Sequence, residues 1–108
     1  MNNVVLVGRL TKDPEMLDTK DNSKKRTIVT LAVTRNYKNS EGIYDTDFIR
    51  CILWNAVASS ACEYCKSGDV VGIKGRLESR KYETEEKEVK YITEVIVEKI
   101  TFLSSKKV

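Results

Sequence analysis

Three short segments of the chain interleave aromatic and basic side chains at strand-like spacing. Unstacked bases bind flat aromatic rings and phosphates bind Lys and Arg, so this mixture suits a single-stranded nucleic acid. Neither contact depends on which base is present, so the chemistry predicts binding without sequence preference. The segments are Arg35-x-Tyr37-Lys38, Phe48-x-Arg50-x-x-x-Trp54 and Arg80-Lys81-Tyr82.

The aromatic residues of these segments also have a structural interpretation. Trp54 and Phe48 could belong to the core, because large aromatic side chains are well buried on average. Tyr37 and Tyr82 could be half-exposed strand residues that happen to lie beside charges.

Charge is distributed unevenly along the chain. The net charge of +3 is small and indicates little by itself. Residues 72–82, however, hold four cations against the single anion Glu78. Lys74 and Arg76 alternate along this segment, so we add them to the candidate phosphate contacts, although such a stripe could also be a solvated sheet face.

Residue types that support catalysis are scarce. The chain has no His, and we find neither a Gly-rich phosphate loop nor paired carboxylates for acid–base work, so we predict no enzymatic activity. Cys62-x-x-Cys65 has the spacing of half a zinc site, but only Cys51 remains as a further Cys ligand where four ligands are needed. We therefore expect no metal and three reduced, largely buried thiols, with a small thiol enzyme as an alternative.

The segment 44–54 has two different faces when it is read as a strand. One parity is an ordinary apolar core face, and the other carries Phe48, Arg50, Ile52 and Trp54. We interpret the second face as a stacking surface with an embedded phosphate contact. Ile52 on that face is either covered by a neighbouring subunit or lies beneath the nucleic acid.

The remaining elements follow from β-branched alternation and turn residues. Gly8 suggests a bulge or bend, and Asn55 is a candidate N-cap for the one helix. Five strands with a helix between the third and fourth are the layout of an OB-fold, an all-β Greek-key barrel. The predicted strands are 3–10, 26–37, 44–54, 69–82 and 89–103, and the predicted helix is 56–66.

A length of 108 residues predicts a single domain, which we assign to residues 1–104, with a short end at 105–108. No apolar run approaches the length of a membrane span, and the N-terminus lacks the features of a secretion signal. We therefore expect a cytoplasmic protein with no membrane contact, which binding to DNA would associate with the nucleoid.

The order of several segments resembles the bacterial single-stranded DNA-binding proteins over residues 2–103. The resemblance implies base stacking at Tyr37, Phe48, Trp54 and Tyr82. It also implies phosphate contacts at Lys12, Arg35, Lys38, Arg50, Arg80 and Lys81. The segments that carry it are NVVLVGRLTKDPE, VTLAVTRNYKN, DFIRCILWN, YCKSGDVVGIKGRLESRKYE and YITEVIVEKITFL.

The resemblance further implies a homotetramer that protects single-stranded DNA in replication, recombination, repair or DNA uptake, without a cofactor. Members of the family usually continue into an acidic tip that recruits other proteins, whereas this sequence ends at Lys106-Lys107-Val108. The sequence is either a naturally short member or a shortened chain, and in both cases we expect no recruitment through such a tip. The alternative is an OB-fold module for protein interaction or replication restart that has weak DNA affinity.

Overall fold

The structure is a computed structural model that describes residues 1–17 and 24–104. Each strand begins and ends within one residue of its predicted range. The predicted chain end at 105–108 lies outside the described residues. The elements are β1 (Val4–Leu10), β2 (Arg26–Lys38), β3 (Tyr44–Trp54), α1 (Asn55–Tyr64), β4 (Val70–Glu83) and β5 (Val89–Ser104).

The five strands close into a barrel in the order β1-β2-β3-β5-β4. All neighbouring pairs are antiparallel except β3 and β5, which run parallel. Together with the single helix between β3 and β4, this topology confirms the predicted OB-fold.

Alternation along the strands separates an inner from an outer face of the barrel. The inward parity forms the core, with Leu31, Leu53 and Val71 at most 1% exposed. The outward parity of β2, β3, β4 and β5 is free to form a surface.

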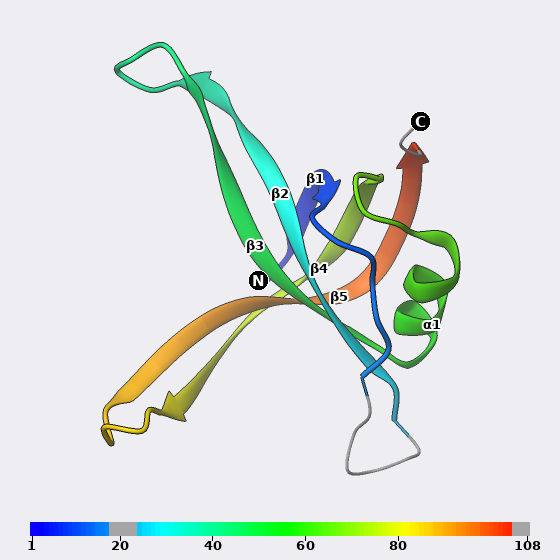
Figure 1. Cartoon of the computed structure of the whole chain (residues 1–108), viewed down its shortest axis with the longest axis vertical. Helices are drawn as coiled ribbons and strands as arrows, with labels where there is room; N and C mark the ends of the chain where they lie inside the picture. The colour runs from blue at the N-terminus through cyan, green and yellow to red at the C-terminus, as the bar shows by residue number, and fades with distance from the viewer. Residues whose placement is uncertain (18–23, 105–108) are drawn as a thin grey trace.

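Two hairpins extend beyond the barrel. Figure 1 shows the β2–β3 and β4–β5 hairpins as two long arms, with α1 on the opposite side of the view. At the tip of β2–β3, the Asn39 side-chain carbonyl accepts hydrogen bonds from the backbone N–H groups of Glu41 and Ile43. Gly42 there has φ +79°, a conformation that favours glycine.

The helix differs from the prediction at both ends. Trp54 is the N-cap residue, without a side-chain capping bond, and Asn55 is the first helical residue. Asn55 does not cap because its backbone N–H donates to the Lys25 carbonyl and its Oδ1 accepts from the Lys25 N–H. Cys65 is the C-cap with extended backbone, so the helix ends two residues before the predicted Lys66. Among the described residues, no helix is long and apolar enough to cross a membrane.

Gly8 does not create the bulge that the sequence suggested. The pairing of β1 with β4 continues without a shift from Val4 to Arg9. A Cβ atom at Gly8 would meet the Ala32 carbonyl oxygen, so the glycine allows β2 to approach β1 closely.

Candidate nucleic-acid interface

A groove of about 440 Å³ runs over the outer faces of β2, β3, β5 and β4. We call this the central groove. It brings together three of the residues predicted from sequence, namely Trp54, Arg50 and Arg80. Its complete lining is Arg26, Ile28, Arg50, Ile52, Trp54, Glu78, Arg80, Glu94 and Ile96.

Trp54 lies in the groove lining rather than in the core, and it is only partly buried. Arg26 is its cross-strand partner on β2, and the Arg26 guanidinium lies 5.6 Å from the Trp54 ring centroid. This cation–π contact covers one part of the ring. Ile52 is 5% exposed and is buried by its own chain, so it needs neither a neighbouring subunit nor a nucleic acid to cover it.

Glu94 connects two of the predicted phosphate contacts. The Nε–H of Arg50 donates to its Oε2 at 2.8 Å, and the Nε–H of Arg80 donates to its Oε1 at 2.9 Å. Glu94 is 6% exposed. Burial acts to raise its pKa, but the hydrogen bonds and charges of the two arginines outweigh this effect, so the pKa lies below its ordinary value. The groove therefore holds a buried carboxylate that keeps its negative charge.

The β2–β3 arm carries two of the predicted aromatic residues. Phe48 is 67% exposed and pairs with Ala32 on the outer face. Tyr37 is 60% exposed, and the Arg35 guanidinium lies 5.9 Å from its ring centroid. Asp47 and Phe48 are consecutive in β3, so their side chains point to opposite faces of the arm. Arg35 binds Asp47, and therefore the Tyr37 ring beside Arg35 lies on the opposite face from Phe48.

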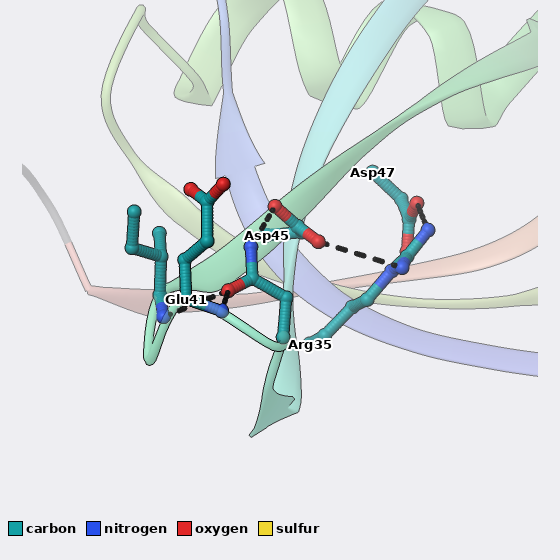
Figure 2. Close-up of polar contacts among 6 residues, drawn as sticks. Arg35, Glu41, Asp45 and Asp47 are labelled. Carbon is teal, nitrogen blue, oxygen red and sulfur yellow. Dashed lines mark hydrogen bonds and ion pairs between the residues drawn. The ribbon is translucent and has the colours of Figure 1, made fainter.

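Arg35 is neutralised by two carboxylates (Figure 2). Its Nε–H and a terminal N–H donate to the two oxygens of Asp47 at 3.0 and 2.9 Å, and Asp45 lies 3.7 Å away. The hydrogen bond from Arg35 lowers the pKa of Asp47, and the same bond raises the pKa of Arg35. Asp45 is itself held by the Asn39 side-chain amide at 3.2 Å. At this point the arm therefore carries more negative than positive charge.

Lys38 lies further along the same arm. Its ammonium is 5.7 Å from the ring centroid of Tyr44, which is 51% exposed. Tyr44 shares its strand parity with Phe48, so the alternation of β3 could have identified it as an aromatic of the outer face.

The β4–β5 arm presents Tyr82 and Lys81 on opposite faces. Tyr82 is 42% exposed and pairs with Lys90, whereas Lys81 pairs with Tyr91. Tyr91 is 73% exposed, and its place beside Lys81 follows only from the strand register.

Arg76, Lys74 and Lys12 lie outside the lining of the central groove. Arg76 donates to Glu78 at 2.8 Å. Lys74 pairs in register with Val5 of β1, and Lys12 is exposed in the segment after β1.

The predicted cations thus divide into two sets. The arginines, namely Arg35, Arg50, Arg76 and Arg80, are all paired with carboxylates. Within residues 1–17 and 24–104 no ion pair involves Lys12, Lys38, Lys74 or Lys81.

Sequence reasoning missed Arg26, Tyr44, Tyr91 and Glu94. The strand parity of Tyr44 was a usable signal. The contact of Arg26 with Trp54 and the register of Tyr91 with Lys81 depend on the exact pairing within a hairpin, whereas the bond of Glu94 to Arg50 depends on the parallel contact of β3 and β5. The spacing of residues along one strand reveals neither.

The cysteines are placed in a way that disfavours thiol chemistry. Burial raises the pKa of the Cys51 thiol to about 12 and is also the main reason that the pKa of Cys65 rises to about 11. A nucleophilic thiol needs the opposite shift. Cys62 is partly buried and forms no disulfide. Among the described residues, no cluster of three or more His, Cys, Asp or Glu could hold a metal ion.

Comparison with known proteins identifies the family of the chain. Residues 1–103 match the Single-strand binding protein family. The chain is 42% identical over 107 residues to Single-stranded DNA-binding protein 1 of Lactococcus lactis, which covers 99% of this chain and 71% of that protein. It is also 42% identical over 105 residues to Single-stranded DNA-binding protein B of Bacillus subtilis, covering 97% and 92%. For the Single-stranded DNA-binding protein of Enterococcus faecalis, the identity is 42% over 106 residues, covering 98% of this chain and 56% of that one. With this match over nearly its whole length, the chain belongs to the single-strand binding protein family.

Proposed function

We propose that this protein binds single-stranded DNA without reading its sequence and has no catalytic activity. The observation that carries the proposal is the exposed Phe48 ring on the outer face of β3, the face that also carries Arg50 and Trp54 of the central groove. A single exposed apolar ring is common by itself, but this ring shares its strand face with a cation and a second aromatic ring, the combination that single-stranded nucleic acid requires. The family membership and the names of the similar proteins support the same ligand.

In this proposal the aromatic residues stack on bases and the cations bind phosphates. Among the cations, the four lysines are free of ion pairs within the described residues, whereas DNA must compete with carboxylates for the four arginines. The proposed stacking residues are Tyr37, Phe48, Trp54 and Tyr82. The proposed phosphate contacts are Lys12, Arg35, Lys38, Arg50, Lys74, Arg76, Arg80 and Lys81.

We further propose that the protein acts as a homotetramer in the cytoplasm, where it would protect DNA during replication, recombination, repair or DNA uptake. Exposed apolar residues on β1 support assembly, since Val5 is 72% and Val7 is 54% exposed. Joining four barrels would multiply the stacking sites along one strand through high effective concentration.

One observation favours a second function, a protein-interaction or replication-restart module with weak DNA affinity. Half of the predicted phosphate contacts are already paired with carboxylates, which lowers the positive charge available to DNA. Salt dependence separates the two functions. Binding to single-stranded DNA weakens with a log–log slope of about −0.7 per phosphate neutralised, whereas contact through apolar area hardly changes.

The test is a titration of the protein with a fluorescently labelled oligo-dT at several salt concentrations, together with its solution mass with and without DNA. Tight binding with a steep negative salt slope and a mass of four chains are the expected results. The absence of binding at low salt would refute the proposed function, and a mass of one chain in both conditions would refute the tetramer.

A further inference from the structure

Glu94 occupies an unusual position for an acidic residue on a DNA-binding face. It is 6% exposed, it lies on β5 between β3 and β4, and it lines the central groove. A carboxylate at this place repels phosphate, so attraction between opposite charges does not explain its presence. A buried carboxylate on a phosphate-binding surface therefore needs another explanation.

Toward the described residues, the two arginines bound to Glu94 each use one of their donor nitrogens. Arg50 and Arg80 both donate through Nε, each to a different oxygen of the carboxylate. Their terminal nitrogens form no hydrogen bond within the described part of the chain, and their side chains are 38% and 48% exposed. One carboxylate thus fixes two guanidinium groups from two strands, with free donors left at the surface.

We propose that Glu94 is a positioning residue that holds Arg50 and Arg80 together as a cradle for one phosphate group of single-stranded DNA. This inference rests on the proposed function. A guanidinium presents a planar fork of donors that matches the oxygens of a phosphate. Fixing both side chains before DNA arrives lowers the entropy that binding would otherwise cost.

In the observed geometry, the carboxylate of Glu94 serves the two arginines through two different oxygens. Its two oxygens accept from both Nε–H groups, whereas a glutamine has a single acceptor oxygen. The amide NH2 of a glutamine would face the N–H of the second arginine, donor against donor. Glu94→Gln should therefore release one arginine while leaving the size of the side chain unchanged.

The experiment compares Glu94→Gln with Glu78→Gln in the oligo-dT titration. Glu78 is the cross-strand partner of Glu94 and also lines the groove, but it is exposed and, among the described residues, accepts only from Arg76. Both substitutions remove one negative charge, so general electrostatics predicts equal or tighter binding for both. Positioning predicts that only Glu94→Gln weakens binding. Its Kd should rise about threefold to tenfold, because binding must then order the released side chain. Its salt slope should also become shallower by about 0.7.

Equal or tighter binding of Glu94→Gln, with the salt slope of Glu78→Gln, would overturn the inference. Failure of the wild-type protein to bind oligo-dT would instead refute the proposed function, and this inference with it.

A merely structural role of Glu94 is tested in a variant that lacks the cradle. In an Arg50→Gln, Arg80→Gln background, adding Glu94→Gln should affect binding no more adversely than Glu78→Gln does. A loss of affinity that persists in this background would contradict positioning. If Glu94→Gln does not fold, Arg80→Lys keeps both the charge and the partner of Glu94 but lacks the second donor fork, so it should weaken binding, and unchanged affinity would overturn the inference.

Discussion

Replacing Phe48 by alanine separates DNA binding from stability. The side chain is 67% exposed and lies on the outer face of β3, so its removal leaves the core intact. The free energy of unfolding should change by no more than about 0.5 kcal/mol, as for most surface substitutions. One lost stacking contact should weaken DNA binding by about 1–3 kcal/mol, which corresponds to about a 5-fold to 150-fold increase in Kd.

The assays are fluorescence anisotropy with labelled oligo-dT and urea unfolding of the same protein samples. Tyr64→Ala is the matched control, because Tyr64 is also exposed (63%) but lies on α1 and contacts Phe102, away from the central groove. Its Kd should stay near that of the wild type. Unchanged affinity of a folded Phe48→Ala protein, or an equal loss in Tyr64→Ala, would refute the assignment of this face to base stacking.

Other perturbations follow from the same surface and from the buried groups. Trp54→Ala should weaken oligo-dT binding more than Lys74→Ala in the same titration, because Lys74 is a single exposed cation outside the groove; the reverse order would indicate that electrostatics dominates. The folded state lowers the pKa of Glu94 below its ordinary 4.5, so its contribution to the free energy of unfolding is present above pH 4.5 and is lost as pH falls through the lowered pKa. Urea unfolding from pH 7 to pH 2 should show this loss in the wild type and a smaller one in Glu94→Gln. Iodoacetamide at pH 8 should alkylate Cys62 before Cys51, because Cys51 is fully buried and burial raises its pKa to about 12. Peptide mapping reads the order of modification, and the opposite order would contradict the packing described for this region.

The strands could be predicted from sequence because their information is local. In 44–54, alternating side chains mark both faces of the strand, and β3 has the same bounds in the structure. The order of five strands and one helix then limits the topology to few possibilities, of which the OB-fold is the one observed.

The start of the helix could not be predicted because it is decided by a distant contact. Asn55 is a common N-cap type, but the Lys25 backbone binds both its N–H and its side-chain oxygen. Its φ of +52° lies in the left-handed region, unlike that of a regular helical residue.

The candidate site was predicted in its residue types but not in its electrostatics. Alternation placed Arg50 and Trp54 on one face of β3, and the structure brings both into one groove. The pairing of Arg50 with Glu94 depends on the parallel contact of β3 and β5, and it joins two residues that are 44 positions apart in the chain. Arg35 could have been linked to Asp47, since both lie in one predicted hairpin, but a bulge between Thr34 and Lys38 obscures the register there.

Trp54 emission during titration with unlabelled oligo-dT tests the central claim most directly. Trp54 is the only Trp in the chain, so the signal reports on a single position in the central groove. Stacking of bases on this face predicts strong quenching that saturates as the oligonucleotide is added, in parallel with its retardation on a native gel. Unchanged emission together with an unretarded oligonucleotide would contradict the claim that this face binds single-stranded DNA.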